Sequence, residues 1–298
     1  MNNSQTVSFQ LFLNNFTLIS SSILIIVSFI GNLLCVYTIT RPEIRSISLF
    51  RFLGFSSVLN NVSNFLILIV TFQTFFGVNK SYLNCSVYRF LSYVPITTSV
   101  WIVVYTGIDR VISVKFPKQY LFRDKICFQL VVVFVILLGD LLINVIFLFT
   151  GGLVLNPETN QTVCNTIKFQ LEAYGILVLF TYTQVIPILL FTVLALITFH
   201  YLSVSKKKLN KKLLKERKFL KLFLSISFFY AISQLPYGIY IVTSNFLKID
   251  HLQEILFHVL FFFTSIYNGL DFVVLYFSNS VYRKCFNSVI CFINSRNK

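Results

Sequence analysis

Asp109 and Arg110 stand side by side at the end of a long apolar stretch of the chain. An arginine is costly in lipid, so its guanidinium is expected to face protein or water and to find a carboxylate. Asp109 is one candidate partner. Glu216, which precedes a later apolar stretch on the same side, is a second. These residue types favour an ion pair at a place where two helix ends meet.

The remaining reactive side chains do not form a catalytic or metal-binding set. No apolar stretch carries a convergent catalytic set, and no group has the spacing of zinc ligands. Asp140 and Asp271 are acids inside apolar stretches, and Asn144 is a candidate partner for Asp140 one helical turn away. We therefore expect no enzyme, no metal site and no cofactor.

Seven apolar stretches must position these residues, because about 20 apolar residues cross a bilayer as a helix. The chain is 56% hydrophobic and 12% charged. We predict an all-α membrane protein, a seven-transmembrane helix bundle with a short amphipathic C-terminal helix. It forms a single domain with an extracellular N-terminus (1–17), the bundle (18–277) and a cytoplasmic helix and tail (278–298). The expected spans are residues 18–39, 49–76, 87–114, 126–150, 173–202, 219–246 and 252–277.

Positive charge lies on one side of these spans. Of the 25 lysine and arginine residues, 21 lie in the gaps and tail of one face or in the span ends next to them. Basic residues stay cytoplasmic, so a multi-pass membrane protein with its N-terminus outside is expected. The net charge of +15 then indicates attraction to anionic lipid of the inner leaflet, and no nucleic-acid partner.

Other residues separate along the same axis. Glycosylation sequons on the expected outer side begin at Asn2, Asn15, Asn79, Asn84 and Asn160, and a sixth begins at Asn61 inside the second span. Cys85 and Cys164 lie on the outer side, where the compartment permits disulfides. Cys285 and Cys291 lie on the expected cytoplasmic tail, where they are candidates for palmitoylation.

The order and spacing of these residues resemble the rhodopsin-like family of G-protein-coupled receptors. Asp109-Arg110-Val111 resembles the Asp-Arg-Tyr that ends the family's third helix. Glu216 resembles the glutamate of the sixth helix that locks this arginine. Cys85 precedes Arg110 by 25 residues, the family's spacing for the outer disulfide, which Cys164 would complete. The positions that match the family's activation relay are Asn32, Asn60, Pro187, Tyr230, Gln234, Pro236, Asp271, Leu275 and Tyr276.

Several of these positions depart from the family's pattern. Asn60 replaces an aspartate, which removes the charged ligand of a sodium ion, and Gln234 replaces a tryptophan. The segment from Asp271 to Leu275 stands where the family has Asn-Pro-x-x-Tyr, with Tyr276 one residue later. The resemblance therefore implies a divergent member, or one with a rewired activation relay.

The resemblance also bears on the ligand. Ser92 stands where aminergic receptors carry an aspartate, and Ser265 stands where opsins carry a lysine, so neither an amine nor retinal is expected. Residues 153–155 and 162–164 flank a turn and predict a hairpin, which resembles peptide-binding members. We expect a peptide ligand, such as a neuropeptide, with Ser92, Gln234 and Ser265 as candidate pocket residues.

The family mechanism supplies a further expectation. A ligand outside shifts the population of bundle conformations, separates Glu216 from Arg110 and opens a cleft for a heterotrimeric G protein. Two alternatives stay open. A seven-span chemosensory receptor for a small molecule would share the architecture. A small transporter would need a continuous polar path and often an internal repeat, and we detect no repeat.

Overall fold

The fold is that of a computed structural model. It describes residues 3–45, 47–75, 82–116, 125–155, 162–166, 169–204, 211–246, 256, 259–260, 262–264 and 272–296. Within this part of the chain almost every residue is helical.

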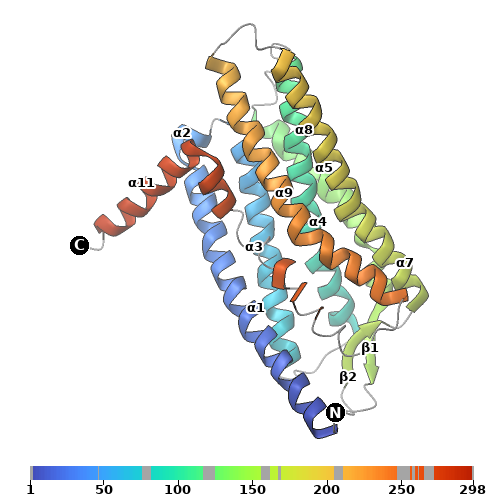
Figure 1. Ribbon diagram of the computed structural model, residues 1–298. Coiled ribbons are helices and arrows are strands. Elements are labelled where there is room, and N and C mark those ends of the chain that lie inside the picture. Colours follow the sequence, from blue (N-terminus) through green and yellow to red (C-terminus); the bar gives the residue numbers. More distant parts are fainter. Residues whose placement is uncertain are drawn as a thin grey trace.

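Long helices lie side by side and form one elongated bundle (Figure 1). The long helices are α1 (Asn3–Ile39), α3 (Ser48–Phe75), α4 (Tyr82–Lys115), α5 (Ile126–Asn144), α8 (Ile186–Val204) and α9 (Lys211–Phe246). The shorter elements are α2 (Pro42–Arg45), α6 (Ile146–Thr150), α7 (Phe169–Phe180), α11 (Ser280–Arg296), and the strands β1 (Gly151–Leu155) and β2 (Thr162–Thr166).

Six of the predicted spans are confirmed as helices long and apolar enough to cross a membrane, among the described residues. The seventh, expected over residues 252–277, is described only in short helical pieces, the longest of which begins at Phe272. α1 begins at Asn3, well before the expected span, because residues 3–17 contain no proline or glycine to stop a helix. α9 likewise begins ahead of its apolar part, which starts at Phe219.

The bundle is apolar outside and partly polar inside, the reverse of a soluble protein. Leu142 is 75% exposed and Phe277 is 72% exposed, as expected for side chains that face lipid. α3 contacts both α1 and α4 and buries serines and asparagines against them. The hydroxyls of Ser56 and Ser99 lie 2.6 Å apart across the α3–α4 contact. Such hydrogen bonds between helices help hold a bundle together in lipid.

The fifth span is not one regular helix. α7 leads into a single π-helical turn, η2 (Thr181–Val185), which continues as α8 just before Pro187. Proline has no backbone N–H, so Pro187 cannot bond the carbonyl of Thr183 four residues earlier. The hydroxyl of Tyr230 in α9 donates to that carbonyl instead. The irregular turn therefore joins the fifth span to the sixth.

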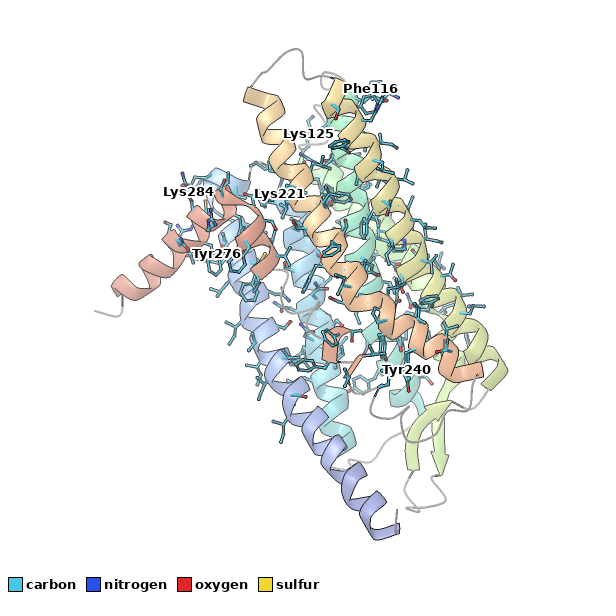
Figure 2. The ribbon with its side chains drawn as sticks, viewed as in Figure 1. Phe116, Lys125, Lys221, Tyr240, Tyr276 and Lys284 are labelled. Atoms are coloured by element: carbon cyan, nitrogen blue, oxygen red, sulfur yellow. The ribbon has the colours of Figure 1, made fainter. Side chains whose placement is uncertain are left out.

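The predicted hairpin is confirmed. β1 and β2 pair antiparallel, with Leu153 opposite Cys164 and Leu155 opposite Thr162. The hairpin lies at the end of the bundle that carries the N-terminus, and α11 leaves the bundle beside α2, nearer the other end (Figure 1). Lys125, Lys221 and Lys284 also lie in the half of the molecule away from the N-terminus (Figure 2).

Candidate functional site

Arg110 lies buried at the end of α4, with 5% of its surface exposed. Its Nη2 pairs with Oδ2 of Asp109 and donates to Oγ of Ser48, 2.7 Å away, at the start of α3. The Ser48 hydroxyl in turn donates to the same Asp109 oxygen over 3.1 Å. The three side chains therefore form a closed polar triangle that fixes the guanidinium against α3.

The predicted pairing of Asp109 with Arg110 is confirmed, whereas the second carboxylate, Glu216, has a side chain outside the described residues. Ser48 was missed by sequence reasoning, because it is 61 residues from Asp109 in the sequence. The one local signal is its position as the first residue of α3.

An aromatic ring of α9 also lies against Arg110 and begins a series of ring contacts. The guanidinium carbon lies 5.4 Å from the centre of the Phe219 ring of α9. Phe219 meets Phe50 of α3 edge to face at 6.2 Å, and Phe50 stacks on Tyr282 of α11 at 6.3 Å. Phe286 extends this series, stacking on Tyr282 at 5.9 Å. The end of the bundle is thus joined from α4 to α11 through rings.

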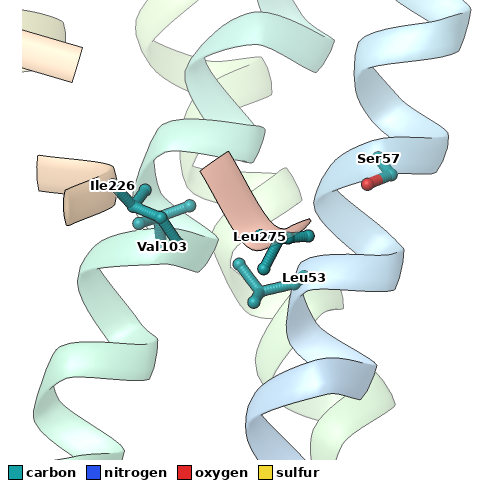
Figure 3. A pocket seen from close by; sticks show the side chains of 5 residues that line it. All are labelled: Leu53, Ser57, Val103, Ile226 and Leu275. Atoms are coloured by element: carbon teal, nitrogen blue, oxygen red, sulfur yellow. The ribbon is translucent and has the colours of Figure 1, made fainter. Parts of the chain in front are cut away.

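A small cavity lies deeper in the bundle, bounded by α3, α4, α9 and the end of the seventh segment (Figure 3). Its lining residues are Leu53, Ser57, Val103, Ile226 and Leu275. Leu275 is 1% exposed and stands where the family carries a tyrosine. The Ser57 hydroxyl donates to the Cys35 thiol of α1 over 3.4 Å, so the lining is mostly apolar. Packing, rather than a polar contact, joins the sixth and seventh segments here.

A second polar cluster joins the third, fourth and fifth spans. Asp140 of α5 is fully buried, and its Oδ1 accepts a hydrogen bond of 2.9 Å from the hydroxyl of Tyr182 in η2. The Tyr182 ring packs on Trp101 of α4 at 4.8 Å. Asn144, the candidate partner one turn away, donates to the backbone carbonyl of Asp140 (2.8 Å) and to the Thr97 hydroxyl (3.1 Å). The hydrogen bond to the Asp140 carboxylate comes from Tyr182 of another helix.

The other relay positions fall at helix contacts. Asn32 and Asn60 are buried in α1 and α3, and Pro187 is buried in α8. Tyr230 is buried and packs on Phe191 of α8 at 5.8 Å. The remaining positions are Gln234, which donates to the Thr264 carbonyl over 3.4 Å, Pro236, which is exposed on α9, and Tyr276, whose ring lies 5.5 Å from that of Phe286.

Ser92 does not offer a free hydroxyl to a ligand in this conformation, because it donates to the Tyr88 carbonyl of its own helix over 2.7 Å. Asp271, Ser265, Asn2, Asn79 and Asn160 lie outside the described residues. Asn15, Asn84, Cys85, Cys164 and Cys291 lie in described helices or strands, but their side chains do not belong to the described part. The expected disulfide, glycosylation and ligand contacts at these positions therefore stay predictions.

Cys285 lies half-buried on α11. Burial raises the pKa of its thiol, the nearby Glu43 of α2 raises it further, and Arg41 opposes both. A raised pKa means that less of the nucleophilic thiolate is present at neutral pH. Burial, together with Glu43, therefore slows the uncatalysed reaction of this cysteine.

The bundle, its lipid-facing apolar surface and its buried polar end define a multi-pass helical membrane protein. The family model of the 7 transmembrane receptor (rhodopsin family) matches residues 31–271, well over half of the chain. The protein therefore belongs to the rhodopsin family of seven-transmembrane receptors, which are signalling receptors and in general not enzymes. In a comparison with curated proteins, none matched the chain.

Proposed function

We propose that this receptor carries a signal from an extracellular ligand, a peptide rather than an amine or retinal, to a heterotrimeric G protein. The observation that supports coupling most is the buried Arg110, held by Asp109 and Ser48 near the last residue of α4. Phe116, which follows α4, lies at the end of the bundle away from the N-terminus (Figure 2). Burying an arginine at the mouth of a membrane bundle costs free energy. Ionisable residues at such places therefore mark functional sites.

The spacing of residues on α9 supports a part for Glu216. It lies three residues before Phe219, and residues three apart share a helix face. The Phe219 ring lies over Arg110, so this spacing favours a pairing of Glu216 with Arg110. We infer that Glu216 and Arg110 pair in the resting receptor and separate when the sixth span moves outward.

This function requires a receptor in the plasma membrane with its N-terminus on the extracellular side. The basic residues of the described helices support it, because Lys125, Lys221 and Lys284 all lie in the half of the molecule opposite the N-terminus (Figure 2). The whole chain then acts as a single seven-transmembrane domain with its short amphipathic helix, α11, along the inner surface. Cys285 and Cys291 of α11 are the proposed palmitoylation sites.

The β1–β2 hairpin supports a peptide ligand. It lies at the end of the bundle that would face outside, beside the N-terminus (Figure 1). Its strands pair Cys164 with Leu153, and β1 contacts α4. Cys85 lies in the first turn of α4, so a disulfide to Cys164 would pin the hairpin there. A hairpin held in this way gives an extended ligand a rigid wall.

Coupling is tested by measuring basal G-protein dissociation in cells across the G-protein families, at equal surface expression. We expect Glu216→Ala to raise the basal signal and Arg110→Ala to abolish coupling. Arg283→Ala, which removes an exposed arginine of α11, is the matched control and should change little. If neither Glu216→Ala nor Arg110→Ala alters any signal in a well-expressed protein, the coupling proposal is wrong.

The ligand class is tested separately. A tissue fraction that activates the receptor should lose its activity after digestion with proteinase K. An activating fraction that survives digestion would instead favour the chemosensory alternative, a small molecule bound within the same architecture.

A further inference from the structure

We propose that Phe219 holds Arg110 in the resting receptor, as an aromatic latch between the third and sixth spans. The latch consists of Phe219 with Phe50 and Tyr282 behind it. This inference rests on the proposed function, because it assigns a positioning residue to the same coupling site. It differs from the carboxylate pairing of Glu216, since the contact is made by a ring and not by an opposite charge.

The contacts of Arg110 divide by helix. Asp109 is its neighbour in α4, and Ser48 belongs to α3, so neither of these bonds restrains the sixth span. The Phe219 ring belongs to α9, and its centre lies 5.4 Å from the guanidinium carbon. That distance is within the range of about 6 Å over which a cation and an aromatic face attract each other. Outward movement of α9 would therefore break this contact directly.

Burial strengthens the contact. Arg110 is 5% exposed and Phe219 is 3% exposed. A cation–π contact gains strength when both partners are removed from water. The burial of both partners therefore favours a strong contact between the guanidinium and the ring.

The Phe219 ring is also supported from behind. Phe50 meets it edge to face at 6.2 Å, and Tyr282 stacks on Phe50 at 6.3 Å. Phe50 and Tyr282 are themselves 0% exposed, so the rings form a dry stack. This stack connects the sixth span to α3 and to α11. Loss of these ring contacts would therefore free the sixth span from α3 and α11 at the same time.

The test follows the position of the sixth span directly. Lys221 is exposed on α9 near the same end (Figure 2). Lys221→Cys, labelled with an environment-sensitive fluorophore, reports opening of the purified receptor in lipid nanodiscs. The background carries serine in place of Cys127, Cys285 and Cys291. Basal G-protein dissociation is measured in parallel on the unlabelled variants in cells.

Three changes at Phe219 separate a cation–π contact from simple packing. Phe219→Leu keeps an apolar side chain and removes the ring, and should raise the open population by about 3- to 30-fold. Phe219→Tyr keeps the ring and should stay near the parent value. Trifluorophenylalanine at position 219 keeps the shape and weakens the ring's negative face, and should give an intermediate value.

Phe52→Leu is the matched control. Phe52 is 1% exposed in the same turn of α3 as Phe50, and its ring meets Tyr105 of α4 at 5.0 Å. The substitution removes an equally buried ring at a similar depth. It should leave the fluorophore signal unchanged.

The outcomes separate the latch from the coupling proposal. If trifluorophenylalanine matches phenylalanine, or if Phe219→Leu leaves the fluorophore signal unchanged while Arg110→Ala shifts it, the latch is wrong. If the signal follows the ring series but no G protein dissociates, the latch stands and the coupling proposal fails. Trifluorophenylalanine alters only three hydrogens, so it decides the question even if Phe219→Leu does not reach the membrane.

Discussion

At the scale of single residues, the third, fourth and fifth spans meet at a buried acid. Asp140 accepts the hydroxyl of Tyr182, whose ring packs on Trp101. Hydrogen bonds between membrane helices are worth about 0.6 kcal/mol on average and up to about 1.7. A hydrogen bond to a fully buried carboxyl, which must find its partner within the bundle, should contribute more than this average.

We predict that Asp140 and Tyr182 are energetically coupled. In a double-mutant cycle of Asp140→Leu and Tyr182→Phe, the coupling free energy should be about 1 kcal/mol, because each single change removes the same hydrogen bond. The measurement is the free energy of unfolding of the purified receptor in detergent. Additive effects of the two changes would show that the bond contributes no stability.

Single residues were predictable where neighbours in sequence are neighbours in space. The Asp109–Arg110 pair follows from adjacency and from the cost of an arginine in lipid. Ser48, Tyr182 and Phe219 act on partners that other helices supply. Which side chain of one helix meets a given side chain of another depends on helix rotation and tilt, and seven apolar stretches do not specify either.

At the scale of elements, helices approach closely where glycine leaves room. A Cβ added at Gly31 of α1 would meet the ring of Phe272 at the end of the seventh segment. Phe272 stands where the family carries proline, so this chain fills the space beside α1 with a ring that also stacks on Phe286 at 6.4 Å. The glycine and the phenylalanine are complementary.

We predict that Gly31→Ala destabilises the receptor by about 1–3 kcal/mol, the usual cost of overfilling a packed contact. Phe272→Leu in the same chain should restore much of the loss. Gly139→Ala is the control, because a Cβ at Gly139 meets nothing within 4 Å. Thermal unfolding midpoints in detergent compare the variants, and equal losses at Gly31 and Gly139 would contradict the prediction.

The type of each element, helix or strand, was more predictable from the sequence than its first and last residues. Apolar length predicted six helices that the structure confirms among its described residues, and turn residues between β-branched flanks predicted the hairpin. The π-helical turn in the fifth span was not predicted, although Pro187 marks its place. The departure from regular geometry depends on Tyr230 in another helix, which supplies the hydrogen bond that proline cannot.

At the scale of the whole molecule, the separation of charge sets which end faces the cytoplasm. The distribution of basic residues alone predicts the orientation, since insertion of a membrane protein responds to lysine and arginine in its loops. The polar interior and apolar surface of the described helices agree with a bundle that lipid surrounds.

We predict that glycans mark the outer end. Asn→Gln changes at Asn15 and Asn160 should each reduce the mass that a glycosidase removes from the receptor, as judged by gel mobility. Asn61→Gln should leave that mass unchanged, because Asn61 is buried within α3 in the membrane. A glycan on Asn61, or none on any sequon of the predicted outer side, would contradict the predicted topology.

The length of α9 makes it a lever. Pro236 lies inside this helix, 25 residues from its first residue, Lys211, and 17 from Phe219. At 1.5 Å per residue, these distances are about 37 Å and about 26 Å. A rotation of about 10° at Pro236 would therefore move Phe219 by about 4–5 Å and the basic tip by about 6–7 Å. Small angular changes at Pro236 therefore become displacements of several ångströms at the far end of α9, on the scale that the proposed coupling to a G protein would need.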